Sequence, residues 1–359
     1  MTSAHADPAR PDFAAAELLR WQEAGCRLGS SPSPFYAELF ARFASDCEQG
    51  HPAVADVLAH APMTINAASP LRLMGGVHRG VLVGEFPSLA AVWPTPERAL
   101  GNVDVAYDLM CELFEAPPPS VLEALTRDPQ TNEVGRSAAL ALGLARIGRE
   151  TGKPVRLFEI GSSAGLNLRI DEYFCDGGSS TWGRPGSRLQ FGADCYASAA
   201  DFGGSTPIVE RRGCDINPID ATTDDGAVTL MSYVWPAQFT RLDRLRRALE
   251  IAHDRPVTID QLSADEWVDR HVVAESGTAT VLTHSVMWQY MPAAVQQRIS
   301  ATMGERGAHA TDDAPLALLA MEPGERAVNM DLSLTLWPGG QRRVLARCGG
   351  HGPPIEPLD

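Results

Sequence analysis

Lysine is almost absent from this chain, in which Lys153 is the only one among 359 residues. Arginine therefore carries nearly all of the positive charge, and 45 acidic against 30 basic residues give a formal net charge of −15. Broad contact with a nucleic-acid backbone needs a cationic face that releases counterions on binding. The composition therefore predicts a protein without a nucleic-acid partner.

Cysteine motifs and long apolar runs are also missing. The seven cysteines form no CxxC pair and no Cys/His ligand spacing, so neither a zinc site nor a small disulfide framework is expected. The amino terminus has no basic segment followed by an apolar run, and no stretch approaches the roughly 18 apolar residues of a membrane span. We expect reduced thiols, no metal ion, no membrane contact and a cytoplasmic location.

The first 150 residues are predicted to be mainly helical. Apolar side chains recur with helical spacing in residues 13–21 and 34–43, and two further apolar segments follow at 121–125 and in the Ala/Leu-rich run 137–147. The last of these is expected to end as a helix at Gly148. The polar, glycine-rich run 74–79 interrupts this region, either as a substrate loop that contains His78 or as a simple connector.

From residue 153 the pattern changes to strands that alternate with helices. Short runs rich in β-forming residues predict strands at 155–160, 208–215, 256–259, 279–284 and 316–321. Helices are predicted at 166–170, directly after the first strand, and at 238–253 and 293–305. Residues 171–207 are rich in glycine, serine and aromatic residues and are interpreted as an insertion near the mouth of the site.

The chain closes with a predicted hairpin, whose strands at 331–337 and 341–347 are joined by the turn 338–340. Five strands of the βα type indicate a parallel sheet with helices on both faces. We therefore predict an α/β fold with a Rossmann-like sheet of five parallel strands and a C-terminal antiparallel hairpin. A helical N-terminal cap would span residues 1–150 and the cofactor domain residues 151–359.

The turn after the first predicted strand indicates a ligand site. Small residues at 161–165 let the backbone approach a ligand, and a following helix would present free N–H groups. Glu159 would repel the pyrophosphate of a dinucleotide, whereas it would attract the amino group and sulfonium of S-adenosylmethionine (SAM). Asp215, which closes the second strand, stands where an acidic side chain accepts ribose hydroxyls.

Asp265 follows the third predicted strand, where a carboxylate would accept the adenine amino group. The alternative is a helix start at which Ser263 is the N-cap and Glu266 completes a capping box. Both interpretations remain open.

The same turn also fits a hydrolase. Gly161, Ser163 and Gly165 match the GxSxG nucleophile elbow, with Ser163 as the nucleophile and a later aspartate and His351 as its partners. Hydrolases place several strands before the elbow, whereas the segment before this turn has a helical pattern. A hydrolase would also leave Asp215 unexplained.

Motifs along nearly the whole chain resemble those of a bacterial family of unknown function. They are LRLMGGVH at 71–78, TNEVGR at 131–136, FEIGSSAGLN at 158–167, GCDINP at 213–218, SYVWPAQ at 232–238, HSVMWQY at 284–290 and HG at 351–352. More broadly, residues 155–290 resemble class I SAM-dependent methyltransferases, whose last two strands also form an antiparallel hairpin. The match departs from their motif in the Ser-Ser-Ala of the turn and in the insertion.

The resemblance implies SAM contacts along the predicted strand ends. The expected cofactor contacts are Glu159, Gly161, Ser162, Ser163, Gly165, Asn167, Asp215, Ile216 and Asp265. Arg136 would bind the SAM carboxylate bidentately, and Asn132 or Glu133 would face the acceptor. The alternative for this segment is a helix cap at Thr131.

Residues that follow the fourth predicted strand are expected near the transferred methyl group. His284 would deprotonate an acceptor, or would be a histidine that is merely hydrogen-bonded at a strand end. Trp288 and Tyr290 would stack on a substrate or on the sulfonium, or would belong to the core. Tyr173 of the insertion is a further substrate candidate.

These residues predict a SAM-dependent methyltransferase that acts on a small molecule. One alternative is a SAM-binding protein that catalyses a different reaction, such as intramolecular cyclisation, or that binds without turnover. The other is a serine esterase that uses Ser163. The expected partner is a small-molecule substrate, and a homodimer is left open.

Overall fold

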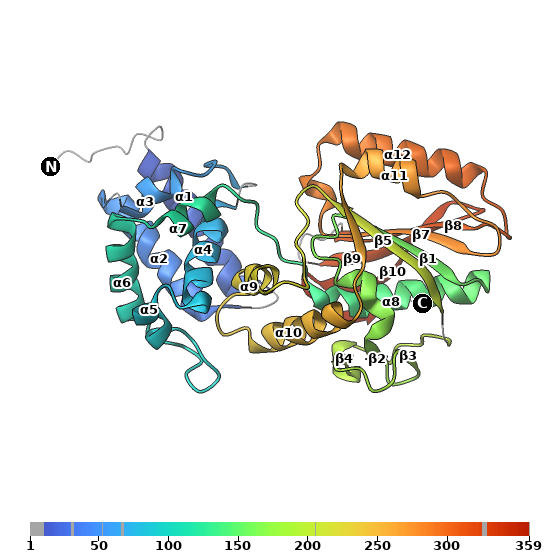
Figure 1. The fold of residues 1–359 in the computed structure, drawn as a ribbon, viewed down its shortest axis with the longest axis horizontal. Coiled ribbons are helices and arrows are strands. Elements are labelled where there is room, and N and C mark those ends of the chain that lie inside the picture. The colour runs from blue at the N-terminus through green and yellow to red at the C-terminus, as the bar shows by residue number, and fades with distance from the viewer. Residues whose placement is uncertain are drawn as a thin grey trace. The chain divides into compact units, whose positions relative to one another are not determined.

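The computed structural model describes residues 11–29, 32–51, 53–65, 68–204, 206–324 and 329–358. The amino-terminal segment, for which no signal peptide is expected, lies outside these residues. The chain divides into two compact units, one formed by residues 1–131 with 227–242 and the other by 132–226 with 243–359. The boundary predicted at residue 150 falls inside the second unit, at the end of a helix (Figure 1).

The described residues of the first unit form helices around one apolar core. Seven of these helices precede residue 132: α1 (Pro11–Leu28), α2 (Pro34–Gln49), α3 (Ala53–Leu58), α4 (Ser69–Val83), α5 (Pro87–Val92), α6 (Val103–Glu115) and α7 (Pro119–Leu125). Their buried faces meet around side chains such as Phe40, Phe43 and Met110. The predictions of helices at 13–21 and 34–43 are confirmed, and the apolar segment 121–125 lies in α7. None of the described helices of either unit is long and apolar enough to cross a membrane.

The glycine-rich run 74–79 is not a loop, because it lies within the helix α4. A Cβ atom at Gly75 would lie 2.5 Å from the ring of Tyr233, and one at Gly76 would lie 2.7 Å from Ala124. The glycines therefore allow neighbouring segments to approach the helix closely. Tertiary packing outweighs the low helix propensity of glycine here.

The second unit contains an eight-stranded sheet in the order β11-β10-β9-β8-β7-β1-β5-β6. Its strands are β1 (Val155–Ile160), β5 (Ile208–Asp215), β6 (Thr258–Gln261), β7 (Ala279–Ser285), β8 (Leu316–Pro323), β9 (Met330–Trp337), β10 (Gln341–Gly349) and β11 (Gly352–Pro357). β6, β5, β1, β7 and β8 are parallel, whereas β9, β10 and β11 add antiparallel pairs. The five parallel strands and the hairpin are confirmed.

β11 was not predicted from the sequence. It contains three prolines, Pro353, Pro354 and Pro357, which lack the N–H group that a central strand donates. The strand lies at the edge of the sheet, where β10 is its only full strand partner and a single bridge joins Ile355 to Tyr196. The prolines argue against a strand in the sequence, but a strand at the edge of a sheet can contain them.

Helices cover both faces of this sheet. On one face, α11 (Ala264–His271) and α12 (Ala293–Ala308) contribute Trp267 and Met303 to a core with Phe158 and Leu282. On the other face, α8 (Ser137–Thr151) lies so close that a Cβ atom at Gly143 would be 2.3 Å from Leu319. Figure 1 shows α11 and α12 above the sheet and α8 below it. The unit is thus a mixed α/β fold with a large, mostly parallel sheet.

α8 continues beyond the predicted end at Gly148. Gly148 lies inside the helix, where a Cβ atom would be 2.1 Å from Oγ1 of Thr206. The helix ends instead at Gly152, whose φ of +63° is the left-handed conformation of a C-cap. Gly148 is therefore required for close packing and not for termination.

The segment after β1 is not the predicted α-helix but a 3-10 segment with a kink at Arg169, η3 (Asn167–Glu172). The hydroxyl of Tyr173 donates to the carbonyl of Leu166 at 2.6 Å, and the guanidinium of Arg169 donates to the carbonyl of Gly165 at 2.7 Å. An α-helix would need these two carbonyls as acceptors for its own N–H groups. Side-chain hydrogen bonds from residues four and seven positions further along the chain therefore take the place of the backbone bonds of a first crossover helix.

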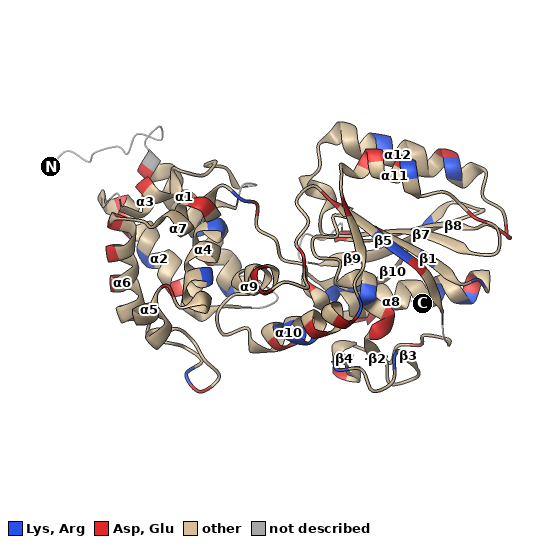
Figure 2. Cartoon of the chain, viewed as in Figure 1, with Lys and Arg blue, Asp and Glu red and all other residues tan. Residues whose placement is uncertain are grey.

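The predicted insertion folds as a small three-stranded sheet. Its strands are β2 (Phe174–Asp176), β3 (Thr181–Gly183) and β4 (Gln190–Phe191), followed by the 3-10 helix η4 (Ala193–Cys195). α9 (Asp224–Ser232) and α10 (Phe239–Asp254) then join β5 to β6. Figure 2 shows residues of both charges on α10 and α12, as on solvated helices.

Candidate functional site

The order of the parallel strands creates a switch point between β1 and β7. From β1 the chain moves to β5 and β6 on one side of the sheet, and then to β7 and β8 on the other. Ligands of open α/β sheets bind at such a point, outside the carboxyl ends of the strands. In the register of the sheet, Glu159 lies beside Thr283 of β7 and Gly213 of β5.

The turn that follows β1 has an unusual backbone. Gly161, Ser163 and Gly165 have φ values of +63°, +52° and +64°, in the left-handed region. Two of the three are glycine, for which this conformation is readily available, whereas Ser163 is an outlier of the kind that occurs at functional sites. The turn thus holds its small residues in a fixed and strained shape.

Protein acceptors already bind several N–H groups of this turn. Ser163 N donates to Oδ2 of Asp215 at 2.8 Å, and Leu166 N donates to Oδ1 of Asn132 at 2.8 Å. Ser162 N donates to the carbonyl of Cys214 at 3.0 Å. A loop that cradles phosphate presents such N–H groups to the ligand instead. The N–H groups of residues 162, 163 and 166 are therefore already bound within the protein, and carboxyl groups line the turn.

Glu159 is 2% exposed at the end of β1. Burial, and next the neighbouring Asp215 carboxylate, raise its pKa to about 8, while Arg136 and Arg169 act in the opposite direction. A buried carboxyl group in this state favours a positively charged ligand, because a cation would compensate the ionised form.

Five buried oxygen atoms near this edge have no hydrogen-bond partner among the described residues. They are Glu159 Oε2, Ser163 Oγ, Asp265 Oδ1, Thr283 Oγ1 and Glu322 Oε2. The other three side-chain atoms in this condition are spread over Gln22, Trp93 and Trp182. Since buried polar groups are almost always hydrogen-bonded, this concentration marks the place where a ligand would supply the missing partners.

Asp265 and Ile216 lie at the ends of the outer strands. Asp265 is 7% exposed at the start of α11 and forms an ion pair with Arg298. The alternative capping box is not formed, because the side chain of Ser263 makes no capping hydrogen bond. Ile216, next to Asp215, is 61% exposed. Its side chain thus offers an apolar surface on which a flat ring could pack.

The segment 131–137 braces the site. Arg136 donates from Nη1 to the carbonyl of Ser285 at 2.8 Å and from Nε to the carbonyl of Gly350 at 3.3 Å. Glu133, and not Thr131, caps the 3-10 helix η2 (Val134–Arg136), because its Oε1 accepts from the N–H of Gly135. These contacts connect three loops at the strand ends.

Asn132 and Asn167 hold the turn from two sides. Besides the bond of Asn132 to Leu166, Oδ1 of Asn167 accepts from the hydroxyl of Ser137 at 2.7 Å. Asn167 also donates to the carboxyl group of Glu159. Both side chains therefore position the turn directly.

His284 forms a pair with a residue that sequence analysis missed. Its Nδ1 lies 2.7 Å from Oε1 of Glu322, and its ring stacks on Trp288 with centroids 4.9 Å apart. Tyr290 follows in the same loop and is 65% exposed. The predicted fifth strand ended at Met321, and an acidic residue directly after a buried strand was the available signal for Glu322.

Two predicted substrate residues are buried. Tyr173 has no exposed surface, and its hydroxyl supports the turn through Leu166. His78 lies within the first unit, where its Nδ1 is 3.0 Å from the carbonyl of Ser232 and its ring stacks on Trp93. Burial lowers the pKa of His78 to about 4. Both side chains thus contact other parts of the protein and have almost no exposed surface for a substrate.

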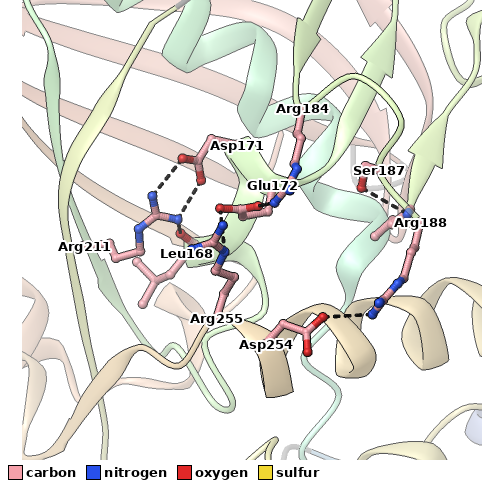
Figure 3. A network of polar contacts seen from close by, with 10 residues as sticks. Leu168, Asp171, Glu172, Arg184, Ser187, Arg188, Arg211, Asp254 and Arg255 are labelled. Carbon is pink, nitrogen blue, oxygen red and sulfur yellow. Dashed lines mark hydrogen bonds and ion pairs between the residues drawn. The ribbon is translucent and has the colours of Figure 1, made fainter.

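An ion-pair network fixes the end of η3 to its surroundings (Figure 3). Arg211 of β5 binds Asp171 through two parallel contacts of 2.6 and 2.7 Å. Glu172 pairs with both Arg184 and Arg255. The network thereby anchors the segment that replaces the first crossover helix.

Replacing Arg211 by lysine should weaken this anchor. Lysine keeps the charge but cannot form the bidentate contact, so we expect a loss of about 1 kcal/mol in the free energy of unfolding, measured by urea titration. The difference should shrink at high salt, because the pair is partly exposed. Arg246→Lys on α10 is the matched control, and equal loss in both variants would contradict the role of the network.

Comparison with known proteins gives one match. A family model described as "Uncharacterized protein conserved in bacteria (DUF2332)" matches residues 16–356. This confirms the predicted bacterial family of unknown function. No curated protein and no solved structure matches the chain, and the resemblance to methyltransferases gains no support from these comparisons.

Proposed function

The chain belongs to the DUF2332 family of proteins conserved in bacteria, and from its site we propose that it is a SAM-dependent methyltransferase that acts on a small molecule. The observation that carries the proposal is the group of unpartnered buried oxygens at the carboxyl ends of the parallel strands. Oxygen acceptors and carboxyl groups at these strand ends suit a ligand that carries hydrogen-bond donors and positive charge.

The ligand class follows from the charges at the turn. A dinucleotide would place its pyrophosphate on the turn beside Glu159, where the N–H groups of Ser163 and Leu166 already have protein acceptors. SAM has no phosphate and instead carries an amino group and a sulfonium. The site therefore favours SAM over NAD.

In this proposal each acidic residue contacts a different part of SAM. Glu159 would receive the amino group, Asp215 the ribose hydroxyls, and Asp265 the adenine amino group beside Ile216. The carboxylate of Asp215 retains lone pairs besides those that accept from the backbone of Ser163 and Asn217. SAM supplies an electrophilic methyl group, and catalysis needs mainly alignment of the acceptor with it.

Calorimetry tests the cofactor assignment. We expect the protein to bind SAM and S-adenosylhomocysteine but not NAD, and Asp215→Ala to weaken SAM binding at least about tenfold, or about 1.4 kcal/mol. Glu305→Gln, an exposed change on α12, is the control. No binding of either adenosyl ligand by the unmodified protein would end the proposal.

A serine hydrolase is the second candidate, favoured by the left-handed Ser163 with its unpartnered Oγ. Two observations oppose it: no strand precedes Val155 in the described residues, and no base lies within hydrogen-bond distance of this Oγ. Labelling of Ser163 by a fluorophosphonate would favour the hydrolase. A SAM-derived product that keeps its own methyl group would instead indicate a non-methylating SAM enzyme.

A further inference from the structure

The hydrogen bonds of Glu322 determine how His284 is oriented. Oε1 of Glu322 accepts from the N–H groups of Met287 and Trp288, at 3.2 and 3.3 Å, in addition to its contact with His284. An oxygen that accepts from two backbone donors is an acceptor for the imidazole as well. Nδ1 of His284 therefore donates, and the lone pair lies on Nε2.

The pair borders the proposed cofactor site. Thr283, the preceding residue, lies beside Glu159 in the sheet register, and Met287 lies so close to Gly161 that a Cβ atom there would be 2.8 Å from it. Between them, Val286 has a φ of +50°, a costly conformation for a β-branched residue. Such strain persists where the surrounding structure enforces it, and it is frequent at functional sites.

The surroundings of the pair limit the acceptor. Glu322 disfavours an anionic molecule, whereas the exposed ring of Tyr290 and the half-buried ring of Trp288 offer aromatic surface in the loop after β7. His284 is 3% exposed, so water competes little for its lone pair and an acceptor must reach it beside Trp288. A carboxylate acceptor would be ionised already and would need no base, whereas a hydroxyl group must lose its proton.

We propose that His284, positioned by Glu322, is the base that deprotonates an uncharged aromatic hydroxyl compound, which is methylated on oxygen. This inference rests on the proposed function. The acceptor oxygen forms a bond to the methyl carbon as the carbon–sulfur bond breaks, and the sulfur keeps that electron pair. The hydroxyl proton moves to Nε2 of His284, while the Nδ1 hydrogen bond to Glu322 stabilises the imidazolium that results.

Nitrogen NMR of the intact protein with labelled histidine tests the arrangement without an acceptor. The signals lost in His284→Asn identify the ring, whose neutral form should carry its proton on Nδ1. Glu322→Gln should change this preference, because an amide can donate to Nδ1. An Nε2–H form in the unmodified protein would overturn the proposal.

Methyl transfer from labelled SAM tests the substrate class. With phenol and catechol as probes we expect labelled ether, and with aniline or benzoate no label. Glu322→Gln should lower kcat by about 10²- to 10⁴-fold, as expected for loss of an oriented base, with the Kd for SAM unchanged. Glu305→Gln should keep the activity of the unmodified protein.

The outcomes separate the two proposals. Three results would refute the role of His284 in a protein that binds SAM: no label on phenol or catechol, a preference for aniline or benzoate, or an unchanged kcat in Glu322→Gln. Each of them leaves the cofactor assignment standing. A protein that binds no SAM refutes both.

Discussion

Replacement of Glu159 by glutamine is expected to abolish measurable SAM binding and to stabilise the ligand-free protein near pH 8. Glutamine resembles the protonated carboxyl group in shape but provides no charge for a cationic ligand. The pKa of Glu159 is raised from 4.5 to about 8, mainly by burial, so the ionised form is disfavoured in the folded state. The ionised Glu159 thus lowers the stability of the ligand-free protein, but it provides the charge that contacts the ligand.

The sign of the pH dependence follows from this raised pKa. The folded protein holds the Glu159 proton more tightly than the unfolded chain, so this group stabilises the fold below pH 4.5 and its contribution is lost as the pH rises to about 8. Thermal unfolding of Glu159→Gln should lack this decline, and the same change at the exposed Glu305 should not alter it.

SAM binding should depend on pH through the same group. A cationic ligand favours the ionised Glu159, so binding should release a proton below about pH 8 and should tighten as the pH approaches that value. Calorimetry in buffers with different ionisation enthalpies measures the released proton. If Glu159→Gln binds SAM as the unmodified protein does, Glu159 does not contact the ligand.

Replacement of Gly213 by alanine is expected to disrupt the turn from the neighbouring strand. A Cβ atom at Gly213 would lie 2.1 Å from Oγ of Ser162, which donates to the carbonyl of Glu159 at 2.7 Å. Overpacking of a buried position costs about 1–3 kcal/mol, and the turn must move to relieve it. We expect a lower Tm and at least about tenfold weaker SAM binding, equivalent to about 1.4 kcal/mol.

Gly304→Ala is the matched control for this substitution. Gly304 lies in α12, and nothing lies within 4 Å of the position of a Cβ atom there. Alanine should therefore stabilise the helix by about 0.5–1 kcal/mol and leave SAM binding unchanged. If Gly213→Ala has the Tm and affinity of the unmodified protein, the turn does not depend on this close contact.

Periodic elements of the fold were accessible from sequence. β1, β7 and β8 are runs rich in apolar and β-branched residues that need little context, and α1, α2 and α10 show a clear helical period. Elements that depend on distant partners were not. The glycines of α4 indicated a loop because their neighbours, Tyr233 and Ala124, are invisible in a local pattern.

The candidate site divides in the same way. Glu159, Asp215 and Asp265 were found because acidic residues at predicted strand ends are a local pattern. Glu322 was missed because its role depends on its contact with His284, 38 residues away in the chain. The roles of Tyr173 and His78 as buried, hydrogen-bonded side chains also depend on contacts with other segments.

By itself, the sequence determined the five parallel strands, the closing hairpin, the helical character of the first part and the acidic residues at the strand ends, because each is set by neighbouring residues. Only the tertiary structure decided that η3 replaces a crossover helix, that the N–H groups of the turn are already bound, and that His284 is oriented by Glu322. The physical reason is that a hydrogen bond is fixed by distance in space. The type of a residue shows which hydrogen bonds it can donate or accept, and the fold decides which partner it meets.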